Sequence, residues 1–203
     1  LEDYFAANSI SFTAVPVNDA AEATQKFKDG ECDAFTGDMS AMVSKKWQLD
    51  GEDTSEGDAL NSGTWIAQEL LSKEPLGAAT RDYDTEWNDV VEWVWFGMIT
   101  AEEFGVDSTN YAAMAISSCD DTGDSYDPGI CRLLTSDLGL GTVDNPLAGT
   151  WMQAVLATSG NYGEAYAASF CSYDDTGDCL ISRAGTANAL VSEGGLQYAP
   201  PMR

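Results

Sequence analysis

The chain has 203 residues, of which 44% are hydrophobic, so it is long enough to bury a core and fits one or two domains. Its 34 acidic residues against 9 basic ones give a formal net charge of -25 with no basic stripe, which argues against nucleic acid and anionic membrane surfaces as partners. The absence of histidine excludes the usual Ser-His-Asp and Cys-His nucleophiles and His-containing zinc sites, and we expect no cofactor.

The first 74 residues alternate between helix-type and strand-type segments. Helices are predicted over 1–9, 18–30 and 39–49, and strands over 10–17, 32–38 and 64–71. The predicted strands are short and apolar, with β-branched and aromatic residues, and they are separated by Ala-rich or amphipathic stretches. Such alternation predicts an α/β sheet with parallel pairs of strands.

The pattern changes to mostly helix near residue 75, after the stretch "SKEPLG", which divides the chain into 1–74 and 75–203. Between 84 and 105, apolar residues recur at three and four residue spacings, which predicts a deeply packed helix. Its apolar run of 90–101 is interrupted by Glu92 and falls short of the ~20 residues that a membrane crossing needs. We therefore expect no direct insertion into a membrane. Two further helices are predicted, over 109–117 and 146–160.

Four of the five cysteines form two closely spaced pairs, Cys119 with Cys131 and Cys171 with Cys179. The spacing predicts two local disulfides and an oxidising compartment, and it leaves Cys32 without a partner.

Each cysteine pair encloses the sequence "DDTGD", which has two interpretations. The loops are either Asp/Gly turns closed by a disulfide or a calcium loop in which Asp120, Asp121, Asp124 and Asp127 converge. An EF-hand is excluded, because counting back from each glycine to the first position reaches a serine. We favour the disulfide-closed turn and expect no metal.

Asp38 follows the predicted strand 32–38, at the end of a strand where ligands of α/β sheets bind. Its carboxylate suits a ligand ammonium group through charge-assisted hydrogen bonds. Asp is equally suited to cap the helix that begins near Met39. Position alone leaves both roles open.

Several runs together resemble the substrate-binding proteins of general L-amino-acid ABC transporters. They are "ISFTAVPVNDAAEATQKFKDGECDAFTGDMSAM", "SKEPLGAATRDYDTEWNDVVEWVWFGMITAEEFGVDSTN", "SGNYGEAY" and "ALVSEGGLQYAPPMR". The resemblance implies a two-lobed, periplasmic-binding-protein-like (class II) α/β fold. In that fold 1–74 would be part of the second α/β lobe, and 75–203 the return crossing and C-terminal helical part of the first lobe, with two Cys-closed insertions.

The resemblance also implies a function. A member of this family has no enzymatic activity, is periplasmic or secreted, and holds an L-amino acid between its lobes for delivery to a membrane permease. Asp38 matches the family's ligand for the α-amino group, Glu74 is placed near the cleft, and Cys32 matches a cysteine whose usual partner lies upstream.

The chain resembles only roughly the last three-fifths of a family member, and the arginine that would hold a ligand carboxylate is missing. The alternative is therefore a structural or accessory subunit. Such a subunit would reuse the fold with other protein subunits in a larger extracellular or organellar assembly, without ligand transport.

Overall fold

The computed structural model describes residues 1–52, 64–67, 69–73, 75–171 and 179–202, with the side chains of 47 and 50–52 outside the description. The chain divides into two compact units, Leu1–Leu76 and Gly77–Arg203. No helix among the described residues has the length and apolar character needed to cross a membrane.

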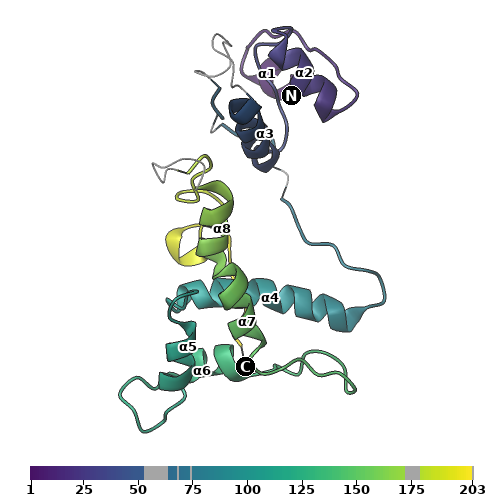
Figure 1. Ribbon diagram of the computed structural model, residues 1–203. Coiled ribbons are helices and arrows are strands. Elements are labelled where there is room, and N and C mark those ends of the chain that lie inside the picture. Colours follow the sequence, from purple (N-terminus) through teal and green to yellow (C-terminus); the bar gives the residue numbers. More distant parts are fainter. Residues whose placement is uncertain (53–63, 68, 74, 172–178, 203) are drawn as a thin grey trace. The chain divides into compact units, whose positions relative to one another are not determined.

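The first unit is built from three helices (Figure 1). They are α1 (Glu2–Ala7), α2 (Ala20–Lys28) and α3 (Met39–Glu52). Helix α2 begins where the Asp19 carboxylate accepts hydrogen bonds from the amides of Ala21 and Glu22, both at 2.9 Å. The unit buries few apolar side chains, among them Ala23 and Val43.

No β-strand forms within the described residues, so the predicted sheet of the first unit is not seen there. The segment 11–17 shows the reason, because its backbone amides and carbonyls make no hydrogen bond with other described residues. A strand exists only when a neighbouring strand accepts and donates its backbone hydrogen bonds, and no described segment lies in that position. Four apolar side chains of 10–17, those of Ile10, Phe12, Val15 and Val17, are accordingly exposed.

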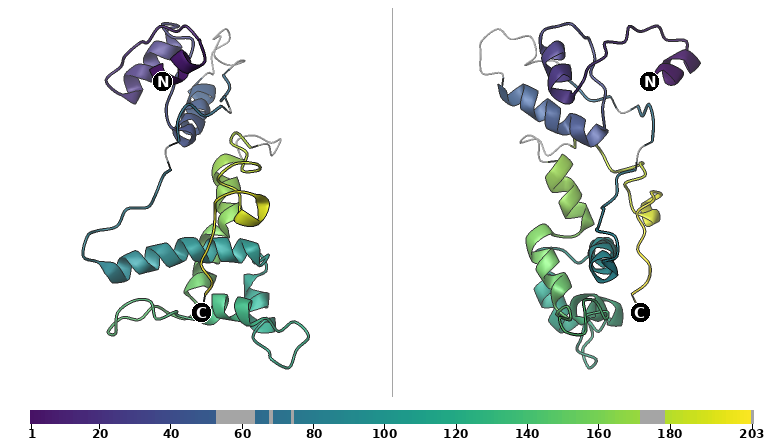
Figure 2. Two further views of the ribbon diagram at one scale, coloured as in Figure 1. Left: turned by 180° about the vertical axis from the view of Figure 1, so that it is seen from behind. Right: turned by 90° about the vertical axis from the view of Figure 1, so that its right-hand side faces the viewer.

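The second unit is a bundle of helices, which the two views of Figure 2 show with α4 crossing the others. Its elements are α4 (Thr85–Glu103), α5 (Tyr111–Ser117), α6 (Pro128–Thr135), α7 (Trp151–Ser159), α8 (Tyr162–Phe170) and the 3-10 turn η1 (Val191–Glu193). Helix α4 contacts α6, α7 and α8. The core consists of buried side chains from α4, α6, α7 and α8, including Ile99, Leu133, Leu134, Met152 and Leu156, and α5 packs against it with partly buried residues.

Helices α6 and α8 were not predicted from periodicity, although both carry clear start signals. Asp127 accepts hydrogen bonds from the first amides of α6, and Pro128 takes the first helical position. Asn161 and Glu164 form a capping box at the start of α8. The helices are eight and nine residues long, too short for an apolar period to stand out.

The prediction that α4 is deeply packed is correct for only one half of the helix. Gly97–Ala101 is buried, and a side chain at Gly97 would come within 2.5 Å of the Met152 sulfur, so glycine allows α4 and α7 to approach closely. Trp87 and Trp95, in contrast, are 55% and 46% exposed. The periodic apolar face extends beyond the helices that cover it.

Candidate ligand-binding residues and disulfide loops

Asp38 lies directly before α3 and is exposed. Its backbone carbonyl accepts the amide of Met42 at 2.9 Å, but its carboxylate has no hydrogen bond with any described residue. Asp19 and Asp127 use their carboxylates as helix caps, whereas Asp38 does not. The capping role is therefore not the one that the structure shows, and the carboxylate is available to an external group.

The structure says less about Glu74 and Cys32, the other two residues that the resemblance singles out. Glu74 lies outside the described residues, so its place near a cleft stays a prediction. Cys32 is a half-buried free thiol, since the four other cysteines are paired with one another.

Both predicted cysteine pairs lie at disulfide-bonding distance. The Cα atoms are 4.9 Å apart for Cys119 and Cys131, and 3.7 Å apart for Cys171 and Cys179. The second "DDTGD" sequence lies in 172–178, outside the described residues.

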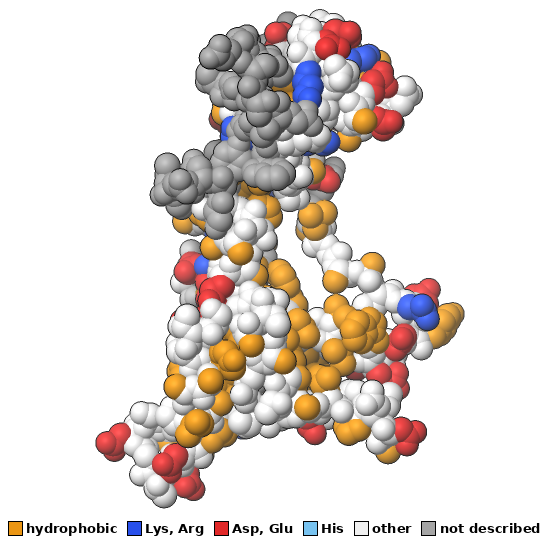
Figure 3. All heavy atoms as spheres, viewed as in Figure 1, with side chains coloured by type: hydrophobic (Ala, Val, Ile, Leu, Met, Phe, Trp, Pro, Cys, Tyr) orange, Lys and Arg blue, Asp and Glu red, His pale blue; other side chains and the backbone are white. Residues whose placement is uncertain are grey.

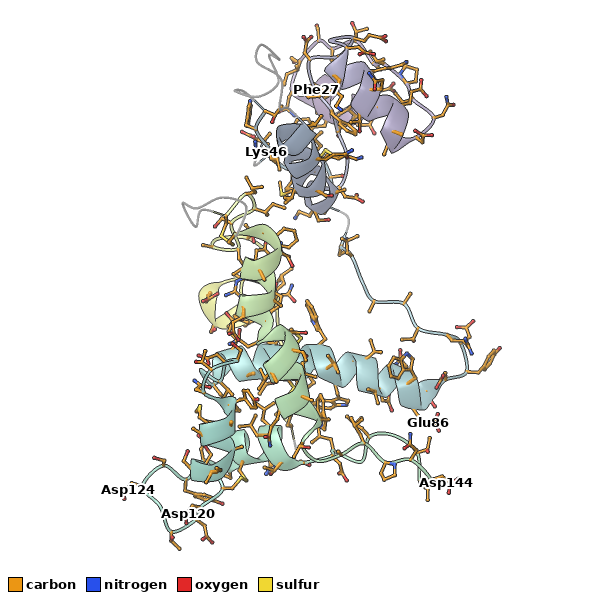
Figure 4. All side chains as sticks on the ribbon, in the orientation of Figure 1. Phe27, Lys46, Glu86, Asp120, Asp124 and Asp144 are labelled. Atoms are coloured by element: carbon orange, nitrogen blue, oxygen red, sulfur yellow. A yellow bond between two sulfur atoms is a disulfide. The ribbon has the colours of Figure 1, made fainter. Side chains whose placement is uncertain are left out.

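The first "DDTGD" loop, on which Figure 4 labels Asp120 and Asp124, is organised by hydrogen bonds of its own. The Asp120 carboxylate accepts from the Thr122 hydroxyl at 2.6 Å and its amide at 3.0 Å, and these bonds lower the pKa of Asp120. Asp127 is engaged in capping α6. No group of three or more acidic or cysteine side chains suited to a metal ion occurs among the described residues. The described loop is an Asp/Gly turn closed by a disulfide.

A cluster that the sequence did not reveal joins α4, α8 and the C-terminal loops. The Arg183 guanidinium donates to both carboxylate oxygens of Glu102, one of them at 2.8 Å, and lies 5.1 Å over the ring of Tyr162. The Tyr162 hydroxyl donates to the carbonyl of Asn188 at 2.8 Å. Burial raises the pKa of Tyr162 to about 12, so the hydroxyl stays protonated as a donor at neutral pH. This cluster holds the chain around 183–188 against the helices.

A shallow surface pocket of about 420 Å³ lies where the C-terminal segment 198–202 meets α4 and α6. Arg132 holds this segment by donating to the carbonyl of Met202 at 2.7 Å. Burial, together with the neighbouring Glu102, raises the pKa of Glu103 at the pocket wall. The "GGLQYAPP" ending thus packs on the helices of its own unit.

The fold defines the class of protein. The chain matches, over all of its length, a solved ABC transporter periplasmic binding protein from Brucella ovis with glutathione bound, with a TM-score of 0.76 and 31% identity. It covers 56% of that structure. No family model matches the chain.

Curated relatives agree with this class. The chain is 36% identical over 206 residues to the glutamate/glutamine/aspartate/asparagine-binding protein BztA of Rhodobacter capsulatus, covering all of this chain and 54% of BztA. It is 35% identical to the general L-amino acid-binding periplasmic protein AapJ of Rhizobium johnstonii, and the match covers 100% of this chain and 53% of AapJ. It is 31% identical to the putative amino-acid ABC transporter-binding protein YhdW of Escherichia coli, and the match covers 99% of this chain and 52% of YhdW.

The resemblance predicted from the sequence is therefore confirmed. The chain is homologous to the substrate-binding proteins of amino-acid ABC transporters, and it spans about half the length of the curated relatives that it matches. These relatives are binding proteins of transporters rather than enzymes. The Brucella neighbour and AapJ are periplasmic, and the two cysteine pairs are compatible with such an oxidising compartment.

Proposed function

We propose that this chain is part of the amino-acid-binding component of an ABC uptake system, which holds an L-amino acid and passes it to a membrane permease. The observation that supports this most strongly is homology over the whole chain to amino-acid-binding proteins. The protein would act in the periplasm or as a secreted protein, without catalysing a reaction.

Asp38 is the proposed contact for the ligand's α-ammonium group. Its carboxylate is exposed and forms no hydrogen bond with other described residues, so binding a cation there breaks no bond within the fold. A charge-assisted hydrogen bond is roughly twice as strong as one between neutral groups. Glu74 is the proposed second acidic residue near the ligand.

The ligand's carboxylate needs a partner too, since an unpaired charge is costly to remove from water. The match covers only about half of each relative, so each relative contains a further, unmatched part of similar length. We propose that the cationic partner of the ligand carboxylate belongs to that unmatched part.

Calorimetric titration of the complete native protein with each L-amino acid tests this function. Replacing Asp38 by Ala is expected to weaken binding by about 10- to 100-fold, the value of a hydrogen bond to a charged group. The melting temperature without ligand should not change, because the carboxylate makes no bond within the described fold.

Asp33→Ala is the matched control, because Asp33 is an exposed carboxylate five residues upstream in the same segment. It should bind like the unaltered protein. Equal affinity of the Asp38 and Asp33 variants would refute the role of Asp38, and no heat with any ligand would refute the function.

Glutathione belongs among the ligands tested, because the Brucella neighbour holds it. Its γ-glutamyl end presents a free α-ammonium and a carboxylate like those of an amino acid. Asp38 would accept the same ammonium, so the Asp38→Ala variant should lose either ligand.

The alternative function is a structural or accessory subunit of a larger assembly. The net charge of -25 and the exposed disulfide loop between Cys119 and Cys131 favour it. Light scattering after size exclusion separates the two functions. A monomer that responds to amino acids supports transport, and stable co-purifying partners without ligand binding support the accessory role.

A further inference from the structure

The surface pocket of the second unit is formed around the C-terminal segment 198–202, which has the sequence "YAPPM". Its volume of about 420 Å³ is that of a small-molecule site. Phe104 and Tyr198 line it with aromatic rings, which are 42% and 58% exposed and therefore open to a ligand. Ala199 and Met202 also line it and are buried. No residue of the proposed function belongs to this pocket.

Two opposite charges line the pocket without neutralising each other. The exposed carboxylate of Glu103, on α4, has no hydrogen bond or ion pair with the described residues. In particular, no ion pair joins it to Arg132, on α6. The preceding glutamate, Glu102, differs in this respect, because its carboxylate is paired with Arg183. Glu103 therefore offers an acceptor for a cationic group at the pocket wall.

Arg132 is the more informative of the two charges. In a chain with 34 acidic residues, an acid beside a pocket is expected by chance, whereas 77–203 contains only four basic residues. Figure 3 shows how few basic side chains, in blue, lie on the visible face of the second unit. Arg132 nevertheless forms no ion pair with a described carboxylate. One of its five N–H groups donates to the Met202 carbonyl, and the others have no partner among the described residues.

We propose that this pocket binds a small zwitterion, whose ammonium group pairs with Glu103 and whose carboxylate pairs with Arg132. A ligand with a single charge would be attracted by one of these side chains and repelled by the other, whereas a zwitterion is attracted by both. An aromatic or apolar part of the ligand would lie against Phe104 and Tyr198. The proposal does not rest on the proposed function, so either can fail without the other.

Residue-resolved NMR titration of the complete native protein tests this proposal. L-Phenylalanine is the probe, and it is compared with 2-phenylethylamine, which lacks the carboxylate, and with 3-phenylpropionate, which lacks the ammonium group. The amide signals of Gly129 and Tyr198, at the pocket, should shift with L-phenylalanine. Each analogue should bind at least about threefold more weakly, because it loses one partly exposed ion pair.

Substitutions assign the two ends of the ligand. Glu103→Gln should weaken L-phenylalanine and 2-phenylethylamine by at least about threefold but should not weaken 3-phenylpropionate. Arg132→Gln should weaken L-phenylalanine and 3-phenylpropionate instead, and its amide can still donate to the Met202 carbonyl. Glu92→Gln is the matched control, because Glu92 is an exposed glutamate of α4 outside the pocket. Asp38→Ala should leave the shifts at the pocket unchanged.

Three results would overturn the proposal. The first is the absence of shifts at Gly129 and Tyr198 up to the solubility limit of L-phenylalanine. The second is a singly charged analogue that binds at the pocket as tightly as the zwitterion. The third is unchanged affinity in Glu103→Gln, whose folding is not at risk, since the carboxylate makes no bond within the described unit. Shifts that disappear in Asp38→Ala would count against it equally, because they would report a ligand bound elsewhere.

Discussion

At the scale of single residues, the ion pair between Glu102 and Arg183 is the contact that most clearly joins distant parts of the second unit. Both side chains are less than one-fifth exposed, and a side chain at Gly163 would come within 2.8 Å of the Glu102 carboxylate, so it would have to displace that carboxylate. Glu102→Ala would leave Arg183 without its carboxylate. We expect it to lower the free energy of unfolding by about 2–3 kcal/mol, somewhat below the loss for a fully buried pair, as measured by urea denaturation.

Glu103→Ala is the matched control for this prediction. Glu103 is the exposed neighbour of Glu102, and it has no ion pair with the described residues. Its removal should change stability little. Equal losses in the two variants would mean that the pair with Arg183 does not stabilise the unit.

At the scale of elements, the disulfide between Cys119 and Cys131 connects the end of α5 to α6 and closes the first acidic loop. Closing a loop of this length restricts the unfolded chain by about 3 kcal/mol on the chain-entropy estimate. The double variant Cys119→Ala with Cys131→Ala should lose about that much free energy of unfolding. The denaturant midpoint of the second unit measures the loss.

Cys32→Ser is the control at this scale, because Cys32 is a free thiol in the described chain. It should leave the midpoint almost unchanged. A double variant that unfolds at the same denaturant concentration as Cys32→Ser would show that the disulfide adds no stability.

At the scale of the whole molecule, the net charge of -25 opposes compactness through self-repulsion. Salt screens this repulsion, with a Debye length that falls from about 30 Å at 0.01 M to about 10 Å at 0.1 M. Raising sodium chloride from about 0.01 M to about 0.5 M should therefore raise the melting temperature by about 2–4 °C, which corresponds to on the order of 1 kcal/mol for a chain of this length.

The same titration at pH 5 is the control, because partial protonation of the carboxylates lowers the net charge there. The effect of salt should be smaller at pH 5 than at pH 7. A melting temperature that is independent of salt at pH 7 would show that the repulsion is of no consequence for stability.

The amino-acid sequence by itself determined the local features and the homology. The disulfide pairs, the helix 84–105 and the resemblance to amino-acid-binding proteins were all readable from it, because they depend on spacing or similarity along the chain. The role of Asp38 was left open by the sequence, because its position is compatible both with binding a ligand ammonium group and with capping the next helix.

Only the tertiary structure decided which residues come into contact when they are far apart in the sequence. Glu102 and Arg183 are 81 positions apart, and no local pattern indicates that they pair. The apolar patterns of 10–17 and of Trp87 to Trp95 predicted burial, but these side chains are largely exposed, because a pattern does not say whether a partner is present to cover it. Local spacing determines which surface a segment offers, and only the packing of the other segments determines what lies against it.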